Sequence, residues 1–113
     1  AEDKHRIVED ALETLDLLSI RNRRIGDVQS RSISGGERKR ASIGMELVSL
    51  PAVLVMDEPT SGLDSSGTFQ LMNMLKSVAA RGVSVVIVIH QPSARVFNLL
   101  DDLILMQDGQ AAY

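Results

Sequence analysis

A short apolar run that ends in two adjacent carboxylates constrains the fold of this chain more than any other feature. Residues 53–64 are Val-Leu-Val-Met-Asp-Glu-Pro-Thr-Ser-Gly-Leu-Asp, so four apolar residues lead directly into Asp57 and Glu58. The run is too short for a helix and is apolar throughout, which is typical of a parallel strand buried on both faces. The sequence therefore predicts a strand that presents two carboxylates at its carboxyl end.

The acidic pair has a physical cost that points to a ligand. Two neighbouring ionised carboxylates repel each other and resist losing water, so a cation or a polarised water is expected beside them. Mg²⁺ held through a carboxylate and a phosphate fits that need, with the second carboxylate positioning an attacking water. The alternative is a buried strand that simply ends in a polar turn.

Length and composition limit the chain to one domain or part of one. Its 113 residues are 44% hydrophobic and carry a net charge of −3, so there is no basic excess and nucleic acid is not an expected partner. Cysteine is absent, which excludes disulfides and thiolate metal sites. The apolar runs are far shorter than the ~20 residues that span a bilayer. A charged helical start without Met suggests an excerpt of a longer protein.

Hydrophobic periodicity and turn residues predict alternating helices and strands, and so an α/β fold. A stripe at helical spacing runs from Ile7 to Leu18, and Ser34 with Glu37 forms a potential capping box. Ser65 or Ser66 is the expected cap of the third helix, and the strand–helix–strand order predicts a parallel pair. The predicted helices are 1–18, 34–49, 65–82 and 94–100, and the predicted strands are 53–56, 83–89 and 103–106. The main loop is 19–32, and Asp108-Gly109 is a predicted turn into a short stub at 111–113.

The predicted strands bring a histidine to the same edge as the acidic pair. His90 directly follows the apolar run 85–89, as Asp57 and Glu58 follow the run 53–56. In a parallel sheet, ligands bind beyond the carboxyl ends of the strands, and neighbouring strands lie ~4.8 Å apart. These side chains could therefore surround one phosphate and its metal. A lone histidine after a strand is otherwise a surface residue or a hydrogen-bonded structural one.

Two further segments indicate ligand or partner binding less specifically. Ser34-Gly35-Gly36 begins a helix, where glycines permit close backbone approach and the helix dipole attracts an anion. Three cations follow at 38–40, where they oppose the dipole, and a solvated face is the safer interpretation of them. Asp64 could be no more than a helix cap, although its position near the acidic pair favours a role in passing information to a partner.

Taken together, these segments resemble the motifs of ATP-binding-cassette proteins in order and spacing, over essentially the whole chain. Residues 33–37 resemble the signature motif, 53–58 the Walker B strand, 61–64 the D-loop, and His90 the switch histidine. Three stretches of the chain are similar to the G subfamily, the White-like and pleiotropic-drug-resistance exporters. They are Gly-Gly-Glu-Arg-Lys-Arg, Asp-Glu-Pro-Thr-Ser-Gly-Leu-Asp-Ser and Ile-His-Gln-Pro-Ser.

The resemblance implies a fold and a division of the chain. The fold is that of P-loop NTPases, a parallel sheet flanked by helices. The chain is the C-terminal part of a single nucleotide-binding domain, with a signature-helix region over 1–50 and a core from the Walker B strand to the switch histidine over 51–113. The Walker A loop is missing, because no lysine of the chain follows a glycine; the lysines are Lys4, Lys39 and Lys76.

The resemblance also implies a role for each matching residue. Asp57 would hold Mg²⁺, Glu58 would act as general base on the attacking water, and His90 would contact the γ-phosphate of ATP. The signature residues would face ATP held mainly by a second cassette in a head-to-tail dimer, and an aspartate would act across that interface. These nucleotide-binding residues are Ser34, Gly35, Gly36, Glu37 and Asp64.

The implied function is ATP hydrolysis that drives export, with the fragment inactive by itself. The implied partners are a second nucleotide-binding domain and a transmembrane domain of the same chain, which would place the cassette on the cytoplasmic face of a membrane. Two alternatives remain open at this point. One is a cassette ATPase acting on DNA or ribosomes, and the other is a catalytically degenerate module that only docks a nucleotide or a partner.

Overall fold

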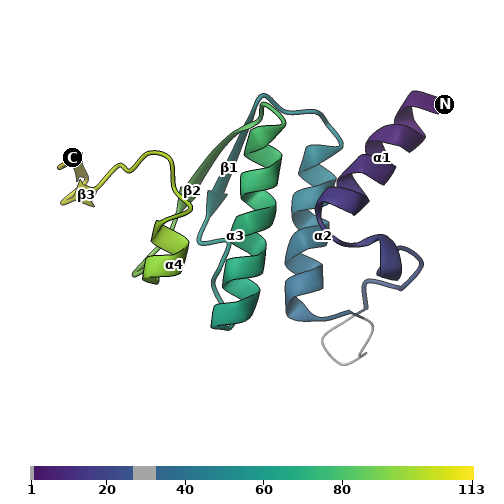
Figure 1. Ribbon diagram of the computed structural model, residues 1–113, viewed down its shortest axis with the longest axis horizontal. Coiled ribbons are helices and arrows are strands. Elements are labelled where there is room, and N and C mark those ends of the chain that lie inside the picture. Colours follow the sequence, from purple (N-terminus) through teal and green to yellow (C-terminus); the bar gives the residue numbers. More distant parts are fainter. Residues whose placement is uncertain (1, 27–32) are drawn as a thin grey trace.

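The computed structural model describes residues 2–26 and 33–113, so the part of the predicted loop at 27–32 lies outside the described residues. Figure 1 shows the elements side by side along the longest axis, with the two termini at opposite ends. The molecule measures 46 × 35 × 24 Å along its principal axes. In chain order the elements are α1 (Glu2–Thr14), the 3₁₀ turn η1 (Leu18–Ile20), α2 (Gly35–Leu47), β1 (Val53–Asp57), α3 (Ser65–Ala80), β2 (Ser84–Val88), α4 (Ala94–Phe97), β3 (Met106–Gln107) and β4 (Gln110–Ala111).

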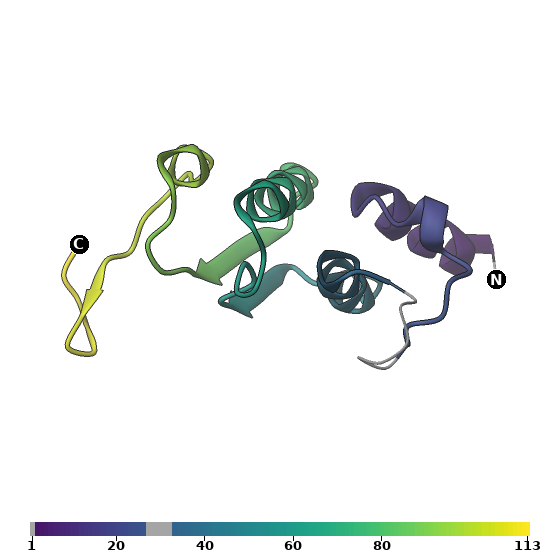
Figure 2. The ribbon, with the colours of Figure 1, turned by 90° about the horizontal axis from the view of Figure 1, so that it is seen from below.

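The centre of the fold is a strand–helix–strand unit. β1 and β2 pair in parallel from Val53↔Ser84 to Asp57↔Val88, and α3 connects them. Figure 2 shows that α3 lies over one face of this strand pair. The predicted parallel arrangement is therefore confirmed, and the carboxyl ends of both strands lie at one edge.

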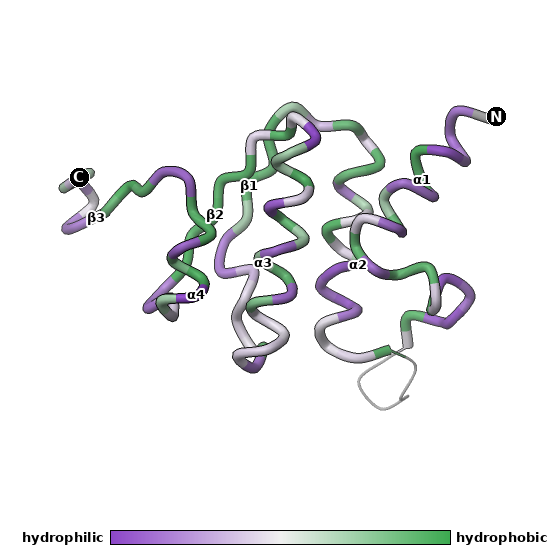
Figure 3. Tube along the Cα trace, viewed as in Figure 1, coloured by the Kyte–Doolittle hydropathy of each residue, from purple (hydrophilic) through white to green (hydrophobic). Residues whose placement is uncertain are grey.

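Only one face of the strand pair is covered by the described residues. Side chains alternate along a strand, so the residues that point away from α3 form a second apolar face. Val55 is 70% exposed there, and Val53, Val86 and Val88 are also exposed. Figure 3 shows hydrophobic residues along both strands. The predicted burial of these strands on both faces is thus wrong for the described part of the chain.

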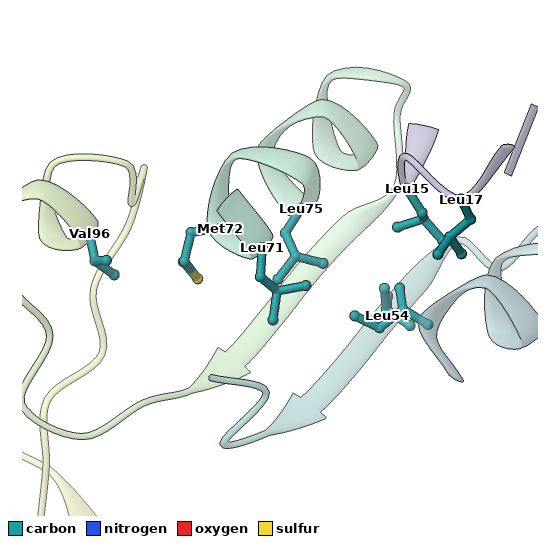
Figure 4. Packing of buried hydrophobic residues seen from close by; sticks show 8 residues of the cluster. Leu15, Leu17, Leu54, Leu71, Met72, Leu75 and Val96 are labelled. Atoms are coloured by element: carbon teal, nitrogen blue, oxygen red, sulfur yellow. The ribbon is translucent and has the colours of Figure 1, made fainter. Parts of the chain in front are cut away.

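The buried core lies between the covered face and the helices. α3 buries Leu71, Leu75 and Val78 at helical spacing, together with Met72. Leu54 of β1 belongs to the same cluster as Leu71, Met72 and Leu75. Figure 4 shows Leu71 and Leu75 directed from α3 toward the strands, with Leu15 and Leu17 beside Leu54. Full burial of such a side chain contributes about 1.5–3 kcal/mol. The core is aliphatic, as expected from the few aromatic residues.

The segment after α1 departs from the predicted helix of 1–18. α1 ends at Thr14, and Asp16 turns the chain with a left-handed φ of 51°. The turn breaks the helical spacing, so Leu17 is 4% exposed and packs in the core, whereas Leu18 is 40% exposed. Leu17 therefore takes the inward position that the periodicity assigned to Leu18.

The predicted third strand does not form over 103–106, although the predicted turn at 108–109 does. The chain forms a separate antiparallel hairpin instead, in which Met106 pairs with Ala111 and Gln107 with Gln110. Asp108 and Gly109 both have positive φ, as a two-residue hairpin turn requires. This local turn determines the pairing, and Ile104 remains 71% exposed.

None of the helices in the described ranges has both the length and the apolar character needed to cross a membrane.

Candidate functional site

The acidic edge is formed where β1 ends. Asp57 is the last residue of the strand, and Glu58 begins a tight turn with a left-handed φ of 47°. Its N–H donates to the carbonyl of Val88 at 2.9 Å, and its carbonyl accepts the N–H of Ser61 at 3.1 Å. A left-handed backbone costs an L-residue roughly 1–2 kcal/mol, so these hydrogen bonds hold Glu58 in a strained conformation. Both carboxylates are exposed to solvent.

His90 meets this edge from the neighbouring strand. Its Nε2 lies 3.0 Å from Oε1 of Glu58, which is hydrogen-bonding distance. The His90 side chain is 71% exposed and that of Glu58 is 51% exposed, so both remain accessible to a ligand. Gln91 then turns the chain away with a φ of 45°. The predicted meeting of the carboxylate and the imidazole at one edge is confirmed.

The start of α2 is a fully formed capping box. Oγ of Ser34 accepts the N–H of Glu37 at 3.2 Å, and the Ser34 N–H donates to Oε2 of Glu37 at 2.6 Å. The Ser34 backbone N–H has the largest effect and lowers the pKa of Glu37, and burial opposes it. The Ser34 hydroxyl, Arg23 and Arg40 lower the pKa further by smaller amounts. The Glu37 carboxylate is thus engaged within the helix start, while the Ser34 hydroxyl can still donate.

The glycines of this helix start leave space for a ligand at one position and contact the neighbouring loop at the other. A Cβ placed on Gly35 would meet no heavy atom within 4 Å. A Cβ on Gly36 would lie 3.8 Å from Cδ2 of Leu63, in the loop that follows the acidic edge. The start of α2 therefore packs beside the segment that leads from Glu58 to α3.

The three cations at 38–40 do not form the solvated face that the sequence predicted. All three are half-buried. Arg38 Nη2 donates to the carbonyl of Gly26 at 2.8 Å, and Nε of Arg40 is buried with no hydrogen-bond partner among residues 2–26 and 33–113. Lys39 Nζ donates to the carbonyls of Pro59, at 3.0 Å, and of Ser61. Lys39 is not directed into solvent, because a loop 20 residues downstream supplies carbonyl oxygens to its ammonium.

Asp64 is the N-cap of α3. Its Oδ1 accepts the N–H of Gly67 at 2.7 Å, so of the caps that the sequence offered the structure has Asp64, and neither Ser65 nor Ser66. A Cβ on Gly67 would lie 2.9 Å from that oxygen, which explains the glycine at this position. Capping accounts for Asp64 locally, and its action across a dimer interface remains a prediction.

A polar hollow lies beside His90, between the loop after Glu58 and the starts of α3 and α4. Its volume is about 230 Å³. The sequence predicted a site role for His90 but no binding role for the hydroxyl residues around it, because they come from three separate segments. The residues lining it are Thr60, Leu63, Ser65, Thr68, Ile89, His90, Gln91, Pro92, Ser93 and Val96.

The available donors fit Mg²⁺ that is shared with a phosphate. Across residues 2–26 and 33–113, no three or more His, Asp or Glu side chains form a group that could hold a metal ion by themselves. Mg²⁺ rarely needs such a group, because it keeps several waters and binds through one or two carboxylates plus substrate phosphates. Asp57 and Glu58, exposed at the strand end, match that pattern.

Comparison with known proteins agrees with this geometry. The profile of the ABC transporter family matches residues 2–61. ABC transporter G family member 28 of Arabidopsis thaliana is 46% identical over 95% of the chain, which spans 10% of that relative. The STR2 G-family member of Medicago truncatula is 46% identical over 100% of the chain, which spans 16% of it. The ABC-type transporter claG of Penicillium crustosum is 46% identical over 94%, and the chain spans 14% of it.

Solved structures of similar fold give the same result. An ATP-binding cassette of an ABC transporter in its ADP conformation superposes with a TM-score of 0.79 and 29% identity, covering 98% of this chain and 41% of the cassette. The cbiO1 protein of Clostridium perfringens, part of the ABC transporter complex cbiONQ, gives a TM-score of 0.81 and 27% identity. The chain covers 43% of that protein and is itself covered completely. The α/β fold with a parallel sheet is therefore confirmed.

Proposed function

Because the chain belongs to the ABC transporter family, with G-family members among its relatives, we propose that it supplies the hydrolytic edge and signature segment of an ATP-binding cassette. The parent protein would hydrolyse ATP to drive export across a membrane. The observation that carries this proposal is the 3.0 Å contact between Nε2 of His90 and Oε1 of Glu58 at the carboxyl edge of β1 and β2.

At this edge each residue has a distinct chemical task. Glu58 orients the attacking water and accepts its proton, since a general base must lie within hydrogen-bonding reach of the proton it removes. His90 holds the Glu58 carboxylate in place and reaches the terminal phosphate. Asp57 binds Mg²⁺ through water, and Mg²⁺ when bound neutralises charge on the phosphates.

The signature segment acts on a second nucleotide. The start of α2 offers backbone N–H groups and a positive dipole end to an anion, and the capping box keeps that start rigid. Ser34, Gly35 and Gly36, with Glu37 fixing the turn, would face ATP bound by an opposite cassette in a head-to-tail dimer. Asp64 would act across the same interface. A transmembrane domain of the parent would hold the cassette on the cytoplasmic side.

The fragment by itself is proposed to be inactive. The lysine of a Walker A loop normally reaches the phosphates, and no lysine in this chain follows a glycine. The isolated 113 residues should therefore release no phosphate from ATP above the background rate. Turnover by the purified fragment that disappears with Glu58→Gln would contradict this.

Replacing Glu58 in the full-length parent tests the proposed chemistry. Glu58→Gln keeps the shape and removes the base, so ATP turnover should fall by about 10²–10⁴-fold, the usual contribution of a general base. ATP binding should persist, because the phosphate grip lies elsewhere. Glu46→Gln, an exposed glutamate on α2, is the matched control and should leave turnover unchanged. Unchanged turnover in Glu58→Gln would refute the role given to Glu58.

A further inference from the structure

We propose that Lys39 is a positioning residue that couples the signature helix to the catalytic carboxylate within one chain. This inference rests on the function proposed above. It gives a role to Lys39, to which neither the motifs nor the family match assigns one. Lys39 lies one turn into α2, whose start faces the second nucleotide, and its ammonium bonds the turn that begins at Glu58. A single side chain thus links the two parts of the site.

The hydrogen bonds of Lys39 have the geometry and the burial that such a link requires. Nζ donates to the carbonyl of Pro59 at 3.0 Å and also to the carbonyl of Ser61, on either side of Thr60. Pro59 is buried and Lys39 is half-buried. Hydrogen bonds from a charged donor are roughly twice as strong as neutral ones, and an ammonium has three donors that can serve two carbonyls at once.

The bonded turn determines where the Glu58 carboxylate lies. The Ser61 N–H donates to the Glu58 carbonyl, which closes the turn, and the Pro59 carbonyl that Lys39 holds belongs to the residue next to Glu58. Glu58 is in a left-handed conformation that an L-residue does not adopt without support. Releasing the Lys39 bonds would let this backbone relax and move the carboxylate away from its contact with His90.

A second contact joins the same two segments. A Cβ placed on Gly36 would lie 3.8 Å from Cδ2 of Leu63, so the start of α2 packs beside this loop one helical turn before Lys39. A displacement of the helix start by a bound anion would therefore reach the loop at two points. Lys39 supplies the polar one, which fixes the carbonyls, while Leu63 supplies only apolar packing.

The experiment compares steady-state ATP hydrolysis by the full-length parent in a graded series at position 39. Lys39→Met keeps the length and removes all donors, and Lys39→Gln keeps two N–H donors without the charge. A misplacement of about 1 Å can cost about 10²-fold in rate, so kcat should fall at least tenfold in Lys39→Met. Lys39→Gln should lie between Lys39→Met and the wild type, and KM for ATP should stay unchanged throughout.

Arg38→Met is the matched control for loss of packing. Arg38 is on the same turn, is equally half-buried and also donates to a backbone carbonyl, but that carbonyl belongs to Gly26 and not to the turn after Glu58. Arg38→Met should keep kcat near the wild-type value. If loss of packing on this turn of α2 were the cause, stability and kcat would fall in both the Lys39→Met and the Arg38→Met variants.

The outcomes separate this inference from the function on which it rests. An inactive wild-type parent, or an active Glu58→Gln variant, would refute the proposed function. A wild type that is active, a Glu58→Gln variant that is not, and a flat kcat across Lys, Gln and Met at position 39 would overturn the role of Lys39 alone. If Lys39→Met does not fold, the Gln variant decides: a kcat lowered at constant KM supports the proposal, and a wild-type kcat overturns it.

Discussion

The helix-covered face of the strand pair and its carboxyl-terminal edge make opposite contributions to the stability of the fold. On the covered face Leu54 and Leu71 are almost fully buried, and each adds to stability. At the edge Glu58 and Gln91 both adopt left-handed backbone conformations, which lower stability, and charged side chains stay in solvent. The difference indicates that the core maintains the fold, while the edge gives up stability to hold a carboxylate and an imidazole in contact.

The largest expected effect on stability comes from the covered face. Leu71 is 2% exposed, so Leu71→Ala removes buried methyl groups and leaves a cavity. The free energy of unfolding should fall by about 2–5 kcal/mol, measured by urea denaturation of the parent cassette. Gln70→Ala, at the exposed neighbouring position, should stay within about 0.5 kcal/mol of the wild type. If ATP turnover per folded molecule also collapsed in Leu71→Ala, the separation between core and edge would fail.

A smaller effect of opposite sign is expected at the edge. Gln91 has a φ of 45°, and a left-handed backbone costs an L-residue roughly 1–2 kcal/mol. Gln91→Gly should therefore raise the free energy of unfolding by about 1 kcal/mol, after the larger backbone entropy of glycine is subtracted.

The same substitution inside α3 provides the control. Gln70→Gly should lower the free energy of unfolding by about 1 kcal/mol, because glycine is a poor helix former. Opposite signs for one chemical change at two positions would demonstrate the strain directly. A destabilising Gln91→Gly would mean that the edge is not strained at that residue.

The smallest predicted effect is the pH dependence of the capping box. The pKa of Glu37 is lowered from its ordinary value of 4.5 in the folded chain, chiefly by the Ser34 N–H. The ionised carboxylate therefore stabilises the fold above its unfolded-state pKa, and this contribution is lost as the pH falls through the folded-state pKa. A carboxylate at a helix N-terminus contributes about 0.3–1 kcal/mol.

Glu37→Gln isolates this contribution, because Gln can keep the geometry of the box without the charge. The difference in free energy of unfolding between wild type and Glu37→Gln should be present at neutral pH and should vanish below the folded-state pKa. A difference that is constant from neutral to acidic pH would contradict the assigned cause.

Much of the fold was predictable because it depends on local spacing. The run 53–56 predicted β1, Ser34 with Glu37 predicted the capping box, and the strand–helix–strand order predicted the parallel pair. Errors arose where a single backbone angle redirected the chain. The turn at Asp16 exchanged Leu17 for Leu18 in the core. The turn at 108–109 was predicted, but it pairs Met106–Gln107 with Gln110–Ala111 in a separate hairpin, so the expected strand does not form over 103–106.

The candidate site was predictable in part for a related reason. Asp57, Glu58 and His90 follow apolar strands, so topology alone brings them to one edge. Lys39 was missed because its partners are carbonyl oxygens of a turn 20 and 22 residues away, and backbone carbonyls leave no trace in a sequence. Because Lys39 stands in a row of three cations, its side chain was expected to face solvent. Only the packing of α2 against the loop reveals the contact.

The most direct test of the central claim is a double-mutant cycle on ATP turnover in the full-length parent. The variants are Glu58→Gln, His90→Ala and the double substitution, compared by single-turnover rate. Residues that act as a unit have grossly non-additive effects, so the double variant should be no slower than the worse single variant. If the two rate losses multiply instead, Glu58 and His90 act independently, and their contact at the strand edge is not the working centre of the site.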